Sequence, residues 1–295
     1  MYRGGGRAAG AGPGQDWPRV LRYTINIGQE NPDTEGVRLE PIRRYLERKL
    51  GMPVEVWGSS GYGVTIEAFR ARKIEASTLG PFAYVIGAER ASIEAMVTRG
   101  KPTGEPLQYS GTLTVPASSK LLSIDDVVRH SHDLTVSFVD PASTSGNLVQ
   151  RACFGSLGIE PDRDFKKVVY AMDHPTSALM AVARKVDVAA IGDTALVGLI
   201  KSGKVRADEL RTIWTSPPIP ETLVAVRKDL PPAFKRRLQQ AMLDMAAEAP
   251  GAYSNTAPKV FMERYRNTKF VVATDATYDP VRKLAKGARH LDLPK

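Results

Sequence analysis

Hydrophobic residues along the chain alternate between short β-rich runs and longer stretches with helical spacing. Residues 23–28 are rich in β-branched and aromatic side chains, and residues 39–49 carry apolar side chains three to four positions apart. A second pair follows, with a strand at residues 54–57 and a helix over residues 61–72. This β-α-β-α rhythm predicts an α/β protein with a parallel sheet flanked by helices.

The rhythm resumes after a polar stretch at residues 99–105. Further strands are predicted at residues 113–116, 134–139, 168–170, 188–191 and 223–226, and helices at 123–128, 175–185, 232–247, 258–266 and from 279 onward. The order predicts two α/β lobes joined by two crossing strands near residues 111–117 and 220–227. Lobe 1 then comprises residues 20–112 with the helical segment 223–295, and lobe 2 comprises residues 113–222.

The first residues have a different composition. Residues 1–19 are rich in Gly, Ala and Arg and lack the apolar run of a signal peptide, so they are predicted to form a disordered leader. No later segment reaches the length of a transmembrane helix.

Charge and cysteine content narrow the possible functions. The net charge of +9 favours an anionic ligand, but the basic residues are spread along the chain and no basic-aromatic motif for nucleic acid is present. We therefore expect no nucleic-acid partner. The single cysteine, Cys153, excludes an internal disulfide and is predicted to be a buried structural thiol.

The loop over residues 140–147 carries the clearest candidate chemistry. It reads Asp-Pro-Ala-Ser-Thr-Ser-Gly-Asn and lies between a predicted strand and a predicted helix. Its three hydroxyls, together with the unpaired N–H groups of a helix N-terminus, could donate hydrogen bonds to a tetrahedral oxyanion. The same residues could equally well only cap the helix.

With its preceding apolar strand, this loop is similar to the signature of the PhnD-like family, the periplasmic phosphate, phosphite and phosphonate-binding proteins. The resemblance extends to Gly61-Tyr62-Gly63 with the helix after it, to residues 79–85, and to residues 213–220, in the order of the family. It covers residues 22–270, nearly the whole predicted folded chain.

The resemblance implies a type II periplasmic-binding-protein fold, in which two lobes close on a ligand about a two-strand hinge. The function implied is that of the solute-binding protein of an ABC importer, which captures phosphite, an alkylphosphonate or phosphate in the cleft between the lobes. The ligand-binding residues implied are Tyr62, Tyr84, Ser143, Thr144, Ser145 and His174. The resemblance also implies a periplasmic monomer that docks on an inner-membrane ABC permease, with no cofactor, metal or catalytic residue.

The chain departs from the family where aminophosphonate binders are expected to hold the ligand's ammonium group with carboxylates. The residues near those two positions are Asp193 with Thr194, and Glu221 with Thr222, so the carboxylates are absent or offset by one. A buried ammonium group without a carboxylate is costly, which favours a ligand that lacks an amine. Asp193 and Glu221 are kept as candidate rim residues.

Two other functions stay open. A periplasmic sensor of an oxyanion such as arsenite, signalling to a histidine kinase, would use Cys153 as its thiolate ligand. An enzyme resembling the thiamine-pyrimidine synthases would need an iron-binding cysteine cluster, which one cysteine cannot supply. We therefore expect no enzymatic activity.

Overall fold

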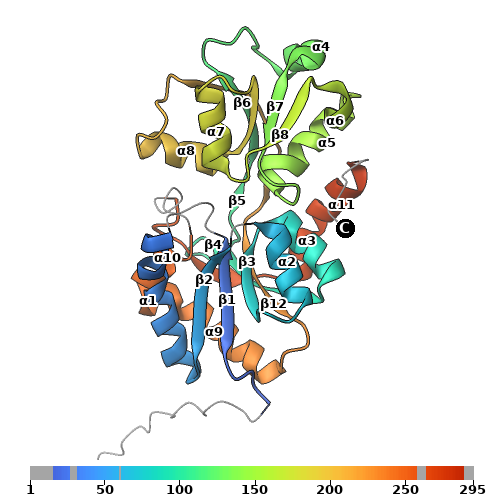
Figure 1. The fold of residues 1–295 in the computed structure, drawn as a ribbon. Coiled ribbons are helices and arrows are strands. Elements are labelled where there is room, and N and C mark those ends of the chain that lie inside the picture. The colour runs from blue at the N-terminus through green and yellow to red at the C-terminus, as the bar shows by residue number, and fades with distance from the viewer. Residues whose placement is uncertain (1–15, 27–31, 60, 258–263, 289–295) are drawn as a thin grey trace, which may run out of the picture.

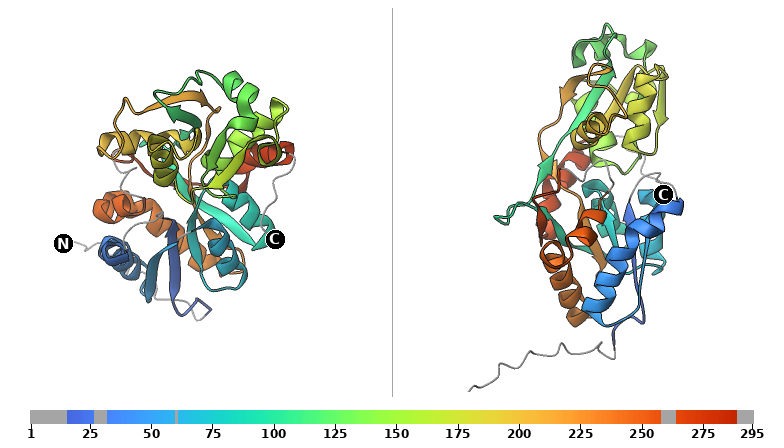
Figure 2. Two further views of the ribbon diagram at one scale, coloured as in Figure 1. Left: turned by 45° about the horizontal axis from the view of Figure 1, so that its top comes forward. Right: turned by 90° about the vertical axis from the view of Figure 1, so that its left-hand side faces the viewer.

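The computed structural model describes residues 16–26, 32–59, 61–257 and 264–288, which form two sheets flanked by helices (Figure 1). The predicted leader lies outside the described residues up to residue 15, and so does most of the helix predicted at residues 258–266. A view turned by 90° shows the same two units along one long axis (Figure 2).

The first unit is built on a six-stranded sheet with the order β13-β4-β12-β3-β1-β2. Its strands are β1 (Leu21–Asn26), β2 (Val54–Ser59), β3 (Ala76–Leu79), β4 (Ile93–Gly100), β12 (Leu223–Arg227) and β13 (Lys269–Val272). The helical segments nearest to these strands in the chain are α1 (Pro32–Leu50), α2 (Tyr62–Arg70), α3 (Pro81–Arg90), α9 (Pro232–Glu248), α10 (Pro250–Asn255), the 3-10 turn η4 (Asp275–Tyr278) and α11 (Asp279–Gly287).

The second unit is built on a five-stranded sheet with the order β10-β6-β9-β7-β8. Its strands are β6 (Gly111–Pro116), β7 (Thr135–Phe138), β8 (Lys167–Tyr170), β9 (Val188–Gly192) and β10 (Leu210–Thr215). The helical segments between these strands are α4 (Ile124–His130), the 3-10 turn η1 (Ser131–Asp133), the π-helical turn η2 (Thr144–Leu148), α5 (Val149–Ser156), α6 (Pro161–Asp164), α7 (His174–Val182) and α8 (Asp193–Lys201).

Two short strands connect the units. β5 (Gln108–Tyr109) leads from the first sheet to the second, β11 (Ile219–Pro220) leads back, and the two pair antiparallel. We propose that these strands are the hinge and that the lobes have the boundaries expected from the sequence, residues 20–112 with 223–295 for lobe 1 and 113–222 for lobe 2.

Both sheets are mixed, so the prediction of a parallel sheet is wrong in part. β1 runs parallel to β2 and β3, but β12 is antiparallel to β3 and β4, and β13 is antiparallel to β4. In the other sheet β7 is parallel to β8 and β9, whereas β6 is antiparallel to β9 and β10. The antiparallel strands β6 and β12 enter their sheets from the hinge, so no helix crossover on the same sheet fixes their direction.

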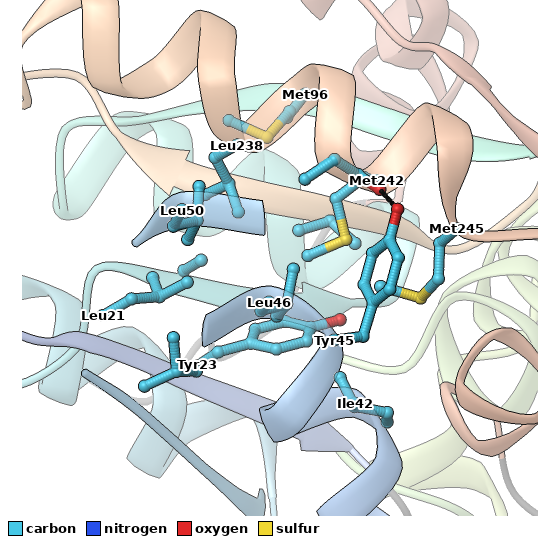
Figure 3. Packing of buried hydrophobic residues seen from close by; sticks show 14 of the residues in the cluster. Leu21, Tyr23, Ile42, Tyr45, Leu46, Leu50, Met96, Leu238, Met242 and Met245 are labelled. Atoms are coloured by element: carbon cyan, nitrogen blue, oxygen red, sulfur yellow. Dashed lines mark hydrogen bonds between the residues drawn. The ribbon is translucent and has the colours of Figure 1, made fainter. Parts of the chain in front are cut away.

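The core of lobe 1 forms where α1 and α9 cover the sheet. Leu21 and Tyr23 of β1 pack with Leu46 of α1 and Met242 of α9, all nearly fully buried (Figure 3). The hydroxyl group of Tyr45 lies within this core and donates to the Ala241 carbonyl at 2.8 Å, which satisfies its polar end (Figure 3). This packing stabilises the sheet of lobe 1.

A second core cluster crosses from one lobe to the other. Ala142 and Leu148, which lie on either side of residues 143–147 of lobe 2, pack in the same buried cluster as Leu79 and Phe82 of lobe 1. Helix α11 contacts α3 in lobe 1 and also α5 and η2 in lobe 2. The two lobes are therefore in direct apolar contact beside the candidate site.

Candidate functional site

The loop over residues 140–147, called the oxyanion loop here, lies buried where the lobes meet. Ser143, Thr144 and Ser145 are each 2% exposed. The Ser143 hydroxyl group accepts the Gly146 N–H at 3.1 Å and caps the π-helical turn η2. Capping uses a lone pair of Ser143 and leaves its proton to donate, so the capping role and the anion-binding role are compatible.

Side chains of this loop cap two helices of lobe 1. The Phe82 N–H, in the first turn of α3, donates to the Thr144 hydroxyl group at 2.8 Å. The Tyr62 N–H, at the start of α2, donates to the Asp140 carboxylate, which also accepts the Ala142 N–H at 2.7 Å. Burial raises the pKa of Asp140, and these two N–H groups counteract that shift. Neither α2 nor α3 has a side-chain cap from its own N-cap glycine, so lobe 2 supplies both caps.

Two tyrosines lie beside the oxyanion loop. The Tyr62 ring packs against Gly80, where an added Cβ would lie 2.9 Å from the Tyr62 hydroxyl oxygen. Tyr109 lies on the hinge strand β5, and the hydroxyl groups of Ser145 and Thr144 interact with its phenol. Burial raises the pKa of both tyrosines, so both phenols keep the proton that a hydrogen bond to an anion requires.

His174 adds a donor from the start of α7. Its Nδ1 accepts the Gly192 N–H at 3.0 Å, so in the neutral ring the proton lies on Nε2. Burial lowers the pKa of His174 to about 4, although Asp173 opposes this shift. His174 is therefore neutral above about pH 5. Gly192 brings His174 and Ser145 together, because a Cβ there would lie 3.0 Å from the Ser145 oxygen and 3.5 Å from His174 Cε1.

The structure does not bring Tyr84 to this group. Its hydroxyl group donates to Asp275 at 2.5 Å and accepts the Ala95 N–H at 3.2 Å. Its ring is fully buried against Tyr278, with the centroids 5.0 Å apart. With both hydrogen-bonding functions engaged in lobe 1, Tyr84 serves the packing of this lobe.

The two candidate rim carboxylates differ in their surroundings. Asp193 begins α8, is partly exposed, and accepts the Thr194 N–H at 2.6 Å. Glu221 follows β11 and is 2% exposed, so it is not an exposed rim residue. Asp173, the neighbour of His174, caps α7 by accepting the Thr176 N–H at 2.6 Å.

Sequence reasoning missed Tyr109, Gly192 and the caps supplied by Asp140 and Thr144. Tyr109 lies in a two-residue strand at the end of a polar stretch, which is too short for a periodic signal. The importance of Gly192 depends on a contact between β9 and a loop about 45 residues earlier, which no local pattern shows.

Within the described ranges, no three His, Cys, Asp or Glu side chains are grouped so that they could hold a metal ion. None of the described helices combines the length and hydropathy needed to cross a bilayer. Cys153 lies on α5, and burial raises the pKa of its thiol, which keeps it protonated.

The sequence and structure match known proteins. Residues 27–278 match the family model described as ABC transporter, phosphonate, periplasmic substrate-binding protein. The chain is 28% identical to the phosphonates-binding periplasmic protein of Escherichia coli strain K12, covering 92% of this chain and 77% of that protein. It is 27% identical to the phosphate-import protein PhnD of Mycolicibacterium smegmatis, covering 87% and 82%. The crystal structure of a binding-protein component of an ABC phosphonate transporter from Pseudomonas aeruginosa superposes with a TM-score of 0.79, at 25% identity, covering 94% of this chain and 88% of that one.

Proposed function

Since the chain belongs to the family of periplasmic substrate-binding proteins of phosphonate ABC transporters, we propose that it captures a small phosphorus oxyanion where its two lobes meet. The observation that carries the proposal is the convergence of neutral donors from lobe 2 and the hinge, namely Thr144, Ser145 and His174 with Tyr109. Tyr62 borders the same place.

Neutral donors suit such a ligand. A tetrahedral oxyanion presents several acceptor oxygens at once, and it is held by many hydrogen bonds rather than by a single counter-charge. Hydrogen bonds to a charged group are about twice as strong as those between neutral groups. Because these donors belong to lobe 2 and the hinge, and Tyr62 of lobe 1 borders them, a bound anion would stabilise the contact between the lobes.

The ligand class can be narrowed further. We propose phosphite, an alkylphosphonate or phosphate, in keeping with the offset carboxylates Asp193 and Glu221. The similar proteins are named for phosphonates and for phosphate import, which supports an alkylphosphonate and phosphate as ligands. The partner is then an inner-membrane ABC permease, the location is the periplasm, and the chain acts as a monomer.

The other functions have less support. The family consists of transport proteins rather than enzymes, and we propose that this chain has no catalytic residue. The protonated thiol of Cys153 does not favour the arsenite sensor, because trivalent arsenic binds thiolates.

The test is a thermal-shift and calorimetry panel with phosphite, methylphosphonate, phosphate, 2-aminoethylphosphonate, sulfate and arsenite. A phosphorus oxyanion at about 1,000 times its dissociation constant should add about 4 kcal/mol to the free energy of unfolding. The double variant Thr144→Ala with Ser145→Ala should bind about 100-fold more weakly, because two hydrogen bonds to a charged ligand are lost.

The matched control is Thr103→Ala with Ser156→Ala, which removes two exposed hydroxyl groups and should leave the affinity unchanged. Unchanged affinity in the double variant of the oxyanion loop would remove that loop from the site. A response to arsenite alone would reject the transport proposal in favour of the sensor.

A further inference from the structure

A buried arginine lies behind the oxyanion loop. Arg151 belongs to the first turn of α5, and it is 7% exposed. Its guanidinium group lies over the Phe138 ring, with the central carbon 4.6 Å from the ring centroid. Burying a charge is costly unless the charged group is paired and hydrogen-bonded, so the contacts of this arginine should account for its position.

The charge of Arg151 is paired at the surface of lobe 2. Nη1 and Nη2 donate to the two carboxylate oxygens of Asp162 at 2.6 and 2.9 Å, and Nη2 also donates to the Tyr170 hydroxyl group at 3.1 Å. The Asp162 side chain is 57% exposed, so the ion pair joins the surface of α6 to the interior. Because a two-point contact with a carboxylate fixes the plane of a guanidinium group, it also fixes the direction of the remaining donor, Nε.

This remaining donor orients the side chain of Asn147 in the π-helical turn η2. Nε donates to Asn147 Oδ1 at 2.8 Å, and Asn147 is fully buried. A guanidinium group has donors and no acceptor, so the end of the amide that faces it is the oxygen. The Asn147 Nδ2 group is thereby directed at the Pro141 carbonyl, to which it donates at 2.7 Å.

The contact between Asn147 and Pro141 joins the two ends of the oxyanion loop. The three hydroxyl-bearing residues 143–145 lie between these ends. Thr144 and Ser145 also lie in η2, and π-helical turns are rare and occur frequently at functional sites. Donors that bind a ligand must be held to within about 0.5 Å by supporting hydrogen bonds, and the Asn147 amide supplies one such bond here.

We propose that Arg151 is a positioning residue for anion binding: it orients Asn147, and Asn147 holds the oxyanion loop so that its hydroxyl groups converge on the ligand. This inference rests on the proposed function and concerns the same site. Arg151 does not need to touch the anion, because each nitrogen of its guanidinium group already donates to the protein. Without Arg151 the Asn147 amide is free to turn its oxygen towards the Pro141 carbonyl, and the bond between the loop ends is lost.

Calorimetry with methylphosphonate on Arg151→Met and Asn147→Ala tests the proposal. Both variants should bind about tenfold more weakly than the wild type, the value of one hydrogen bond to a charged ligand. Asn147→Ala leaves the charge of the protein unchanged, so a loss in this variant separates positioning from simple attraction between Arg151 and the anion. The control Arg163→Met removes an exposed arginine that pairs with Asp164, and it should leave the affinity unchanged.

A double-mutant cycle separates positioning from general damage to the fold. Arg151→Met is combined with the double variant Thr144→Ala with Ser145→Ala. Because a positioning residue acts through those hydroxyl groups, the added loss in this background should be less than about twofold. Arg151→Lys is the milder variant if Arg151→Met does not fold. It keeps the charge and a donor for Asn147, so its loss should be about threefold in the wild-type background and absent in the loop variant.

The outcomes separate this inference from the proposed function. Wild-type affinity in Asn147→Ala, or equal losses for the Arg151 variants in the two backgrounds of the cycle, overturns the positioning role while the proposed function stands. A wild type that binds none of methylphosphonate, phosphite and phosphate rejects the proposed function, and the positioning role with it.

Discussion

At the scale of single residues, His174 shows how one hydrogen bond fixes a donor. The Gly192 N–H occupies Nδ1, so the proton of the neutral ring stays on Nε2 over the pH range where phosphorus oxyanions change their charge. A neutral histidine donates one hydrogen bond without adding a charge. Its affinity contribution should therefore be nearly constant between about pH 5 and 8.

The lowered pKa of His174 predicts how stability depends on pH. In the folded protein the pKa is about 4, against 6.5 for an unperturbed histidine, so between these values the unfolded chain binds more protons than the folded one. The free energy of unfolding therefore falls as the pH drops through this window. Between pH 7 and pH 4.5, the free energy of unfolding should fall by about 2–3 kcal/mol less in His174→Gln than in the wild type. Urea denaturation at the two pH values measures this difference.

The control is His132→Gln, because His132 is 74% exposed. This variant should show the pH dependence of the wild type. Identical slopes for His174→Gln and the wild type would contradict the buried neutral state of His174.

Part of the proposed site could be predicted from the sequence at this scale. The serine and threonine side chains of the oxyanion loop were predicted because they stand together between a strand and a helix, a local pattern. Tyr84 was predicted by resemblance, yet its hydroxyl group is bound by Asp275, which lies nearly two hundred residues later. The direction of a side chain depends on such distant partners, and a local pattern does not contain them.

At the scale of elements, the start of α8 controls how closely the lobe 2 donors approach one another. Gly192 has φ −71° and ψ 136°, which alanine also adopts, so Gly192→Ala should fold without backbone strain. Its new Cβ would lie 3.0 Å from the Ser145 oxygen, and the hydroxyl group would have to move. Calorimetry should show binding of methylphosphonate weakened by about tenfold or more, the value of one hydrogen bond to a charged ligand.

Gly155→Ala is the matched control for Gly192→Ala. Gly155 lies in α5, and an added Cβ there meets no atom within 4 Å. Its affinity should equal that of the wild type, with equal or slightly higher stability because alanine favours helices. Wild-type affinity in Gly192→Ala would show that Ser145 does not hold the ligand.

The elements themselves were predicted to different degrees. The strands and helices from β1 to α2 were predicted because each has a regular pattern of hydrophobic residues. β13 falls between the helices predicted at residues 258–266 and from 279 onward, where no strand was predicted, and it becomes a strand because four residues pair with β4. Pairing with a distant edge overrides the weak preference of such a short segment.

At the scale of the whole molecule, the contact between the lobes is made by the protein itself. The Asp140 carboxylate and the Thr144 hydroxyl group of lobe 2 cap α2 and α3 of lobe 1, and the second core cluster is shared between the lobes. All of these contacts are between groups of the protein. The ligand-free protein should therefore populate a closed state, and the affinity for a ligand should scale with that population.

Asp140→Ala tests this coupling because it removes the cap of α2 without touching the serine and threonine donors. The Tyr62 and Ala142 N–H groups would lose their acceptor, at a cost of about 1–3 kcal/mol in the closed state, and opening would return the Tyr62 N–H to water. Small-angle scattering should show a larger radius of gyration than for the ligand-free wild type, and saturating methylphosphonate should restore the compact form. Binding should weaken by about tenfold, because part of the binding free energy then drives closure of the lobes.

The control Asp133→Ala, at an exposed carboxylate, should change neither the radius of gyration nor the affinity. Equal radii and equal affinities for Asp140→Ala and the wild type would mean that the ligand alone, and not this cap, brings the lobes together.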